Sequence, residues 1–311
     1  MYYKWFVCLA IISSIYAFQV RDYPKNAAQL GEKLFNDPIL SLDTSISCAS
    51  CHIPAQAFSD TVAFSKGVSG KVGNRNAPAL TNMANRELFF WDGRANSLEQ
   101  QVLFPIANAD EMNLPIAQAI LRLQTSNYYK KVFKKVFKNA PTSENLALAI
   151  AAYERTLESS SSPFDRYMNS EDTSHYSSAA ERGRKLFMGK AKCFDCHFSP
   201  DFTGNEFRNI GLYNAQEWHD KGRYAITYKK EDIGKFKVPS LRNAAITAPY
   251  MHNGSFTTLA QVIEYYNNPS TKIHNSINRD SILQKPLGLT SQEKKEIELF
   301  LHTLTDDNYR K

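Results

Sequence analysis

The clearest helical pattern in the chain runs from Thr142 to Leu157. Apolar Leu146, Ile150 and Tyr153 recur there at steps of four and three residues, which places them on one face of a helix. Beyond the N-terminal segment, the longest apolar run is Leu146 to Tyr153, far shorter than the ~20 residues that a membrane-spanning helix needs. The pattern predicts an amphipathic helix of a globular fold, and we expect no membrane span.

A second helical pattern covers Thr290 to Leu304, near the end of the chain. Ser291, two residues before Glu293, is its expected N-cap. Strand-like alternation is scarce, and the remaining segments resemble helices joined by long loops that contain Gly, Asn and Pro. Loops of that length suggest a bound cofactor that fills the core. The patterns together predict a mainly α fold.

The first 17 residues have the character of a secretory signal peptide. Lys4 supplies a positive charge, Trp5 to Ile12 form a short apolar run, and Ala17 is a small residue at the cleavage position. Cleavage there would remove Cys8, and the mature protein would be periplasmic in a Gram-negative source. An uncleaved anchor or a buried first helix remains the alternative.

The four later cysteines belong to two copies of one motif, which is an internal repeat. The motifs are Cys48-Ala49-Ser50-Cys51-His52 and Cys193-Phe194-Asp195-Cys196-His197. Similar stretches precede them: Gly31-Glu32-Lys33-Leu34-Phe35 and Gly183-Arg184-Lys185-Leu186-Phe187. A repeat of half the mature chain predicts two related domains. We place their boundary in the Ser-rich stretch before Pro163, which gives domains 18–162 and 163–311.

C-x-x-C-H is the attachment motif of a c-type haem. The two thiols of each motif add to the porphyrin vinyl groups as thioethers, and the histidine that follows supplies an imidazole to the iron. Cys48, Cys51, Cys193 and Cys196 are therefore the expected attachment residues, with His52 and His197 as iron ligands. A four-cysteine zinc site or two short disulfides are the alternatives, but neither needs a histidine after each second cysteine.

Composition and charge exclude only a few classes of protein. Hydrophobic residues make up 43% of the 311 residues and charged residues 22%, which excludes a disordered or collagen-like chain. The formal charge of +6 is not gathered into long runs, so nucleic-acid binding has no support. Four lysines form a solvated helix face that could also steer an acidic redox partner: Lys130, Lys131, Lys134 and Lys135.

Several further motifs resemble those of the bacterial di-haem cytochrome c peroxidase/MauG family, from about Gly31 to Leu304. They are Phe90-Trp91-Asp92-Gly93-Arg94, Pro105-Ile106 with Glu111-Met112, Val238-Pro239-Ser240-Leu241-Arg242-Asn243, and Ala248-Pro249-Tyr250-Met251-His252-Asn253-Gly254. The resemblance implies two cytochrome c-like helical domains, each with one covalently attached haem. Haem 1, in the N-terminal domain, would react with peroxide, and haem 2 would transfer electrons.

The resemblance also implies roles for single residues. Gln101 and Glu111 would line the distal pocket of haem 1, and Trp91 would relay electrons between the haems. A buried carboxylate with a raised pKa suits the proton transfers that peroxide cleavage needs. From the residues alone, Glu111 could instead be a solvated loop carboxylate, and Trp91 could be ordinary core packing.

A calcium ion between the haems is the third implication of the resemblance. Asn76 would supply a side-chain oxygen, and Thr247 and Pro249 would supply backbone carbonyls. Oxygen ligands are what this hard cation requires.

The sequence departs from many peroxidases of the family at the capping loop of haem 1. The loop from Gly67 to Gly73 contains no histidine, and Val68 falls at or near the capping position. We therefore predict a haem 1 whose distal face is open without prior reduction.

The distal ligand of haem 2 is the second departure. Tyr266 stands where peroxidases of the family carry a methionine, and MauG-type members resemble this chain in having a tyrosine there. A phenolate oxygen stabilises ferric iron, whereas a thioether raises the reduction potential. Met251 is the competing ligand, and Tyr265 is the alternative in the adjacent register. The other histidines are expected to be exposed or hydrogen-bonded: His175, His219, His252, His274 and His302.

These features predict a soluble, exported di-haem peroxidase. It would reduce hydrogen peroxide to water with electrons from a small cytochrome c or cupredoxin, and a homodimer is possible. One alternative is a MauG-like enzyme that oxidises a Trp or Tyr residue of a protein substrate. The other is a non-enzymatic electron-transfer cytochrome, which an unfilled sixth iron site would exclude.

Overall fold

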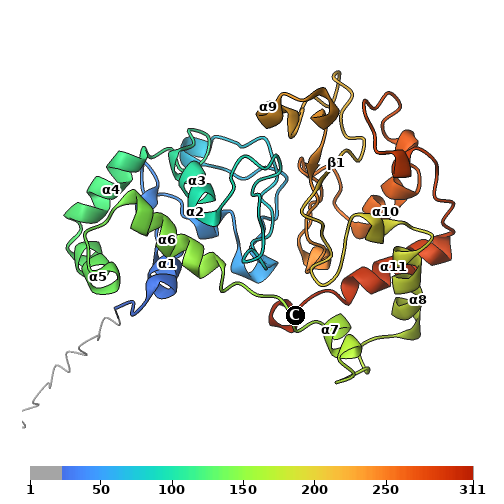
Figure 1. Ribbon diagram of the computed structural model, residues 1–311, viewed down its shortest axis with the longest axis horizontal. Helices are drawn as coiled ribbons and strands as arrows, with labels where there is room; N and C mark the ends of the chain where they lie inside the picture. The colour runs from blue at the N-terminus through green and yellow to red at the C-terminus, as the bar shows by residue number, and fades with distance from the viewer. Residues whose placement is uncertain (1–22, 311) are drawn as a thin grey trace, which may run out of the picture.

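The computed structural model describes residues 23–310 in two lobes joined by one crossing segment (Figure 1). The predicted signal peptide, with Cys8, lies outside the described residues. Within residues 23–310, none of the helices has both the length and the apolar character needed to cross a membrane. The prediction of a mainly α fold is confirmed, since one short two-stranded sheet is the regular β-structure of these residues.

Helices and short 3-10 turns form the N-terminal lobe. They are α1 (Ala27–Asn36), η1 (Pro38–Leu40), η2 (Cys48–Ser50), η3 (Pro54–Gln56), η4 (Val68–Gly70), α2 (Leu98–Gln101), α3 (Leu103–Ala107), α4 (Ile116–Thr125), α5 (Asn127–Phe137) and α6 (Ser143–Glu154). The core of this lobe is built around α1 and α6, which bury Leu30, Leu34, Leu146 and Ile150 almost completely.

The C-terminal lobe repeats this plan with a small sheet added. Its elements are α7 (Pro163–Met168), α8 (Ser178–Met188), η5 (Cys193–Asp195), β1 (Phe207–Arg208), α9 (Tyr224–Thr227), η6 (Lys230–Asp232), β2 (Phe236–Lys237), η7 (Ala244–Ile246), α10 (Leu259–Asn267), η8 (Pro269–Thr271), η9 (Ser281–Leu283), α11 (Ser291–His302) and η10 (Asp307–Tyr309). Strands β1 and β2 are antiparallel, with Phe207 opposite Lys237. The core is formed by α8 and α11 around Phe187 and Phe300.

The glycine of each repeat lies where two helices cross. A Cβ on Gly31 of α1 would lie 1.9 Å from the carbonyl oxygen of Ala149 in α6. A Cβ on Gly183 of α8 would lie 1.9 Å from the carbonyl oxygen of Glu296 in α11. Only glycine allows backbones to approach this closely, so the repeated glycine in the sequence marks the same helix crossing in both lobes.

Both predicted helices are present, with one correction to their caps. Helix α6 starts after Thr142, whose side chain accepts a hydrogen bond from the backbone N–H of Asn145. The predicted N-cap of α11, Ser291, is wrong, because Thr290 caps this helix in a capping box with Glu293. The capping box needs a threonine or serine three residues before its acid, and Ser291 is only two residues before Glu293.

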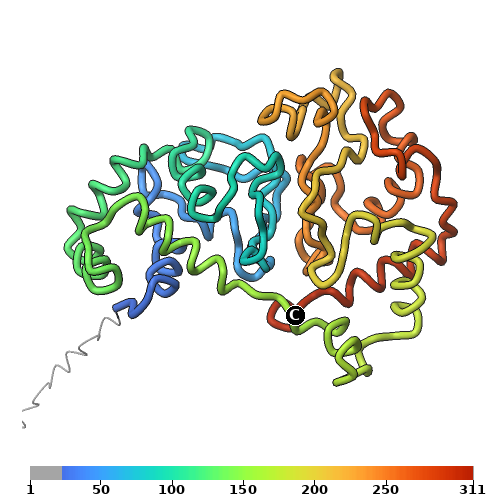
Figure 2. Tube along the Cα trace, viewed as in Figure 1, coloured from blue at the N-terminus to red at the C-terminus, as the bar shows by residue number. Residues whose placement is uncertain are grey.

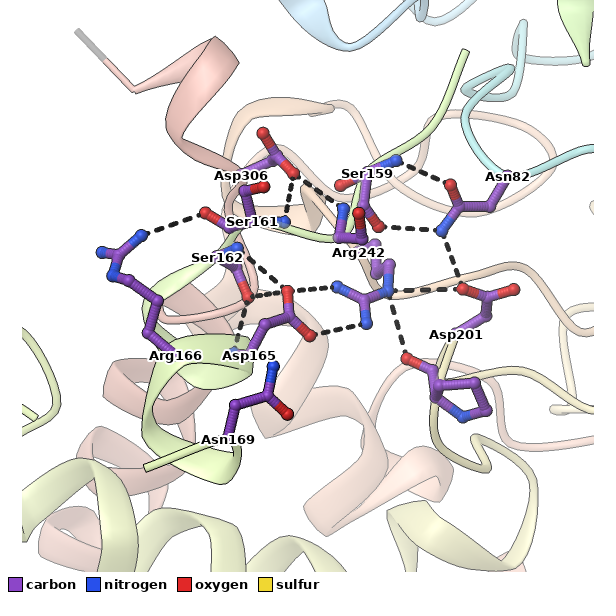
Figure 3. Close-up of polar contacts among 12 residues, drawn as sticks. Asn82, Ser159, Ser161, Ser162, Asp165, Arg166, Asn169, Asp201, Arg242 and Asp306 are labelled. Atoms are coloured by element: carbon purple, nitrogen blue, oxygen red, sulfur yellow. Dashed lines mark hydrogen bonds and ion pairs between the residues drawn. The ribbon is translucent and has the colours of Figure 1, made fainter. Parts of the chain in front are cut away.

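Hydrogen bonds hold the Ser-rich crossing segment, in which Ser159 and Ser162 are buried (Figure 3). Asn82 and Ser159 exchange two hydrogen bonds, from Asn82 Nδ2 to the carbonyl of Ser159 at 2.9 Å and from the Ser159 N–H to Asn82 Oδ1 at 2.7 Å. The N–H groups of Ser160 and Ser161 both donate to Asp306 at 2.8 Å, which ties the C-terminal end of the chain to this segment. The division into domains at residues 162 and 163 stays a prediction.

The loops of the two lobes face each other (Figure 2), and polar contacts join them. Arg75 donates two hydrogen bonds to the Asp220 carboxylate, at 2.7 and 2.8 Å, and a third to Asp92 at 2.6 Å. The backbone N–H of Lys237 donates to the carbonyl of Trp91 at 2.8 Å. These contacts fix the Trp91 loop of the N-terminal lobe against strand β2 of the C-terminal lobe.

Candidate functional site

Each C-x-x-C-H motif lines its own cavity. The N-terminal cavity, of about 500 Å³, contains Cys48, Cys51 and His52 in its lining. The C-terminal cavity, of about 210 Å³, is lined by the second motif: Cys193, Cys196 and His197. Because the two cysteine pairs line different cavities, they do not converge on a single four-cysteine zinc site. The described cysteines form no disulfide.

The two motif histidines make the same hydrogen bond, which leaves the Nε2 atom of each ring able to bind a metal. His52 Nδ1 lies 2.9 Å from the carbonyl oxygen of Phe58, and His197 Nδ1 lies 2.9 Å from that of Phe202. A carbonyl only accepts, so Nδ1 carries the proton and Nε2 keeps its lone pair. Burial also lowers the pKa of both rings, which favours the neutral, ligating form.

Most of the remaining surface of each motif cavity is apolar, as a porphyrin requires. Phe35 lines the first cavity and Phe187 the second, so the phenylalanine of each repeat has the same position in both lobes. Burial raises the pKa of the Cys48 and Cys193 thiols to about 12. In this apolar setting they are neutral thiols. The donor set, the apolar walls and the cavities fit a haem attached through each motif.

Glu111 and Gln101 both lie in the lining of the N-terminal cavity, together with His52. Burial raises the pKa of Glu111, although a 2.7 Å hydrogen bond from Asn108 Nδ2 and the charge of Arg94 act in the opposite direction. The side-chain oxygen Oε1 of Gln101 is buried and has no hydrogen-bond partner among the described residues. The cavity therefore combines a carboxyl of raised pKa with an unpaired acceptor, which suits a small protic ligand such as peroxide or water.

Backbone contacts hold the loop 67–73 against Glu111. The N–H of Val68 donates to the carbonyl of Glu111 at 2.9 Å, and a Cβ on Gly67 would lie 2.2 Å from the carbonyl oxygen of Asp110. Val68 is buried, but it is not among the residues that line the cavity. The loop thus supports the backbone of Glu111 and brings no ligating side chain into the cavity.

Trp91 lines both cavities, and its indole is held at the lobe interface. Its Nε1–H donates to the carbonyl of Asn76 at 2.8 Å. The backbone of Trp91 is also held by the N–H of Lys237, so the ring orientation is fixed from two sides. The ring of Trp91 thus lies between the two cavities, and its role as an electron relay stays a prediction.

Tyr266 and Met251 both line the C-terminal cavity, so the geometry keeps both as ligand candidates. Burial raises the pKa of Tyr266, and its neighbours Tyr265, Cys196 and Cys193 add to the effect. Tyr265 differs, because its hydroxyl donates to the carbonyl of Ile210 at 2.6 Å and it is absent from the cavity lining. The adjacent-register alternative is therefore disfavoured by the position of Tyr265.

The three predicted calcium residues come from both lobes and belong to the lining of the C-terminal cavity. Asn76, Thr247 and Pro249 all line it, and the N–H of Asn76 donates to the carbonyl of His252 at 2.7 Å. The side chain of Asn76 donates through Nδ2 to the carbonyl of Val62 at 3.1 Å, which leaves its oxygen Oδ1 as the atom able to bind a cation.

The expectation for the remaining histidines is wrong for one of them. His175, His219, His274 and His302 are exposed, whereas His252 is buried. Its ring stacks on Phe236 at a centroid distance of 3.6 Å, and burial lowers its pKa to about 4. An uncharged imidazole packs well on an aromatic ring, and His252 belongs to the wall of the C-terminal cavity.

Glu154 and Lys237 are among the cavity residues that the motif search missed. Glu154 is 4% exposed and lines the N-terminal cavity, and Lys237 lines both cavities. The signal for Glu154 was its spacing, since it lies four residues after Ile150 on the buried face of α6. Lys237 had no comparable signal, because its position depends on the contact between the lobes.

Comparisons with known proteins agree with this geometry. A family model described as di-haem cytochrome c peroxidase matches residues 25–173. Cytochrome-c peroxidase IdrP1 of Pseudomonas sp. (strain SCT) is 35% identical over 318 residues, covering 92% of this chain and 83% of the relative. Methylamine utilization protein MauG of Methylorubrum extorquens is 35% identical over 279 residues, covering 88% and 77%.

A solved structure also matches over most of the chain. It is a MauG-like protein associated with microbial copper homeostasis, with a TM-score of 0.84 and 32% sequence identity. The match covers 93% of each chain. Both lobes, and the way they are joined, are therefore similar in the two proteins.

Proposed function

The chain belongs to the di-haem cytochrome c peroxidase/MauG family, and we propose that it reduces hydrogen peroxide to water with electrons from a small periplasmic cytochrome c or cupredoxin. The observation that carries the proposal is the N-terminal cavity, where Glu111 and Gln101 accompany the motif histidine His52. An electron-transfer cytochrome has no need of a carboxyl and an unpaired acceptor in its haem cavity.

The family implies two c-type haems, and the two motifs would hold them. When bound, the iron in the N-terminal cavity supplies the redox chemistry and the site at which peroxide is polarised. Glu111 takes a proton from one peroxide oxygen and returns it to the other, so that water can leave. Gln101 Oε1 accepts a hydrogen bond from peroxide and orients it. Trp91 provides the aromatic contact between the two cavities.

A MauG-like role is the second candidate function. In this role the enzyme oxidises a Trp or Tyr residue of a protein substrate. Tyr266 in the C-terminal cavity favours it, since a phenolate disfavours the reduced state that a peroxidase fills with donor electrons. The absence of histidine from the loop 67–73 fits either role, because it leaves the N-terminal site open.

The proposed function includes further components that follow from the family resemblance. A calcium ion bound by Asn76, Thr247 and Pro249 would link the two lobes where they meet on the cavity wall. Export by the N-terminal segment would place the enzyme in the periplasm, where a homodimer is possible.

Replacement of Glu111 tests the peroxidase proposal. Glu111→Gln keeps the shape but cannot accept a proton, so the peroxide-dependent oxidation of a reduced small cytochrome should slow by about 10²–10⁴-fold. Glu99→Gln is the matched control, because this carboxylate pairs with Arg155 outside the cavity. Unchanged turnover in Glu111→Gln would remove Glu111 from the mechanism. A wild-type holoprotein inert to peroxide would refute both enzyme proposals.

Replacement of Tyr266 separates the two candidate roles. Tyr266→Phe should change the absorption spectrum of one haem and leave the other unaltered, because the phenolic oxygen is the proposed ligand. Met251→Leu is the matched comparison, since Met251 lines the same cavity. A spectrum that responds to Met251→Leu alone would assign thioether ligation and favour the peroxidase over the MauG-like role.

A further inference from the structure

Lys237 lies at the junction of the two cavities and has no ion-pair partner among the described residues. It lines both of them, and its side chain makes no hydrogen bond or ion pair with any residue of the described chain. Burial lowers its pKa to about 8; the charge of Arg86 acts in the same direction and that of Glu87 in the opposite one. A cation in such a place is costly unless an anion compensates it.

Glu87, the carboxylate whose charge acts on Lys237, belongs to an exposed residue and forms no ion pair with it. The two carboxylates beside Arg86 and Arg242 are used by these arginines. Arg242 donates two hydrogen bonds to Asp165, at 2.8 and 2.9 Å. Asp201 serves both Arg242, at 3.3 Å, and Arg86, at 3.4 Å. Two carboxylates thus balance two guanidinium groups (Figure 3 shows the Arg242 side of this cluster), and neither of them pairs with Lys237.

The backbone of Lys237 is held by hydrogen bonds, which set the direction in which its side chain leaves the strand. Its N–H donates to the carbonyl of Trp91, and it pairs with Phe207 in the sheet. The preceding residue, Phe236, stacks on His252. Since alternate residues of a strand face opposite sides, Lys237 is on the face of β2 away from His252.

We propose that Lys237 binds a haem propionate carboxylate at the junction of the two cavities, and that its charge raises the reduction potential of the haem it binds. A haem carries two propionates, which are the anions that a loaded cavity brings to this position. The positive charge favours the reduced iron, because ferrous haem has one positive charge fewer than ferric haem. The proposal concerns the cofactor and its potential, so it does not depend on which substrate is oxidised.

Spectroelectrochemical titration of the holoprotein tests this role. A unit charge roughly 10 Å from an iron changes the ratio of its oxidation states about tenfold at an effective dielectric constant near 20. Lys237→Met should therefore lower the midpoint potential of at least one haem by about 59 mV, the equivalent of a tenfold change in a one-electron couple. Lys237→Arg should remain close to wild type, because a guanidinium also binds a carboxylate.

Lys235→Met is the matched control. Lys235 is two residues away, pairs with Asp232 at 3.1 Å, and is not part of either cavity lining. Its removal subtracts the same charge from outside the cavities and should leave both potentials unchanged. An unshifted Lys237→Met, or an equal shift in Lys237→Arg or Lys235→Met, would overturn the proposal.

The haem content of every variant is measured before the titration, because a substitution could prevent the protein from incorporating haem. Poor haem loading of Lys237→Met with normal loading of Lys237→Arg supports carboxylate binding, because arginine keeps the positive charge that methionine lacks. Poor haem loading of both variants overturns the proposal, since a positive charge at this position would then not be sufficient for haem binding. Peroxide turnover is not part of the readout, so a failed proposal here is distinguishable from a failed peroxidase assignment.

Discussion

Glu154 shows how one buried acid can make stability depend on pH. It is 4% exposed, and its Oε2 has no hydrogen-bond partner among the described residues. Burial raises its pKa to about 8, with a lowering contribution from Arg155 and a smaller raising one from Glu99. The unfolded chain releases this proton near pH 4, so the two states hold different numbers of protons between about pH 4 and pH 8.

Glu154→Gln should therefore become more stable relative to wild type as the pH rises. Between the two pKa values the folded wild type keeps a proton that the unfolded chain has lost, so this contribution to stability declines with increasing pH. The amide does not titrate. We expect a relative gain on the order of 3 kcal/mol between pH 5 and pH 9, measured by urea unfolding of the holoprotein. Parallel pH profiles for the two proteins would contradict a buried, protonated Glu154.

At the scale of elements, the two helix crossings determine where each haem motif lies. Helices α1 and α6 cross at Gly31, and α8 and α11 cross at Gly183. Phe35 and Phe187 follow these glycines by one helical turn and line the cavities. The crossing thus brings a phenylalanine to the wall of each cavity, near the histidine of the motif.

Gly31→Ala should destabilise the N-terminal lobe. The new Cβ would overlap the Ala149 carbonyl, and overpacking of this kind costs about 1–3 kcal/mol, or more where backbone must move. Thermal unfolding of the holoprotein would measure the loss. Gly73→Ala is the matched control, because a Cβ there meets no atom within 4 Å. Equal melting temperatures for the two variants would show that the crossing tolerates a wider separation.

At the scale of the whole molecule, the lobes are joined by charged groups close to the cavities. Arg75 binds Asp220 of the other lobe with two hydrogen bonds and Asp92 of its own lobe with one. Burial alone would raise the pKa of Asp220, but the hydrogen bonds and charge of Arg75 outweigh it and the pKa is lowered. The carboxylate is therefore ionised at neutral pH, and the link between the lobes is a true ion pair.

A double-mutant cycle on Arg75→Gln and Asp220→Asn should give a coupling of about 1.5–3 kcal/mol, as hydrogen bonds to charged groups typically do. Unfolding of the holoprotein in denaturant is the measurement. The Arg155–Glu99 pair is the control, because both side chains are more exposed and such pairs contribute only about 0.2–1 kcal/mol. A coupling no larger than that of the control would mean that the Arg75–Asp220 pair does not hold the lobes together.

The sequence predicted local features best. The spacing of Leu146 and Ile150 located α6, because helical periodicity is a property of neighbouring residues. The cap of α11 was misplaced by one residue, since serine and threonine at adjacent positions both accept hydrogen bonds well. His252 was misjudged because the aromatic ring that it stacks on, Phe236, lies sixteen residues earlier in the chain.

The two C-x-x-C-H motifs were determined by the sequence alone, because attachment of a haem depends on residues within one turn of chain. Only the tertiary structure placed Trp91 in the lining of both cavities and left Lys237 as the unpaired cation between them. Both positions result from the packing of one lobe against the other. A contact between distant segments depends on the whole fold, so no local pattern of residues encodes it.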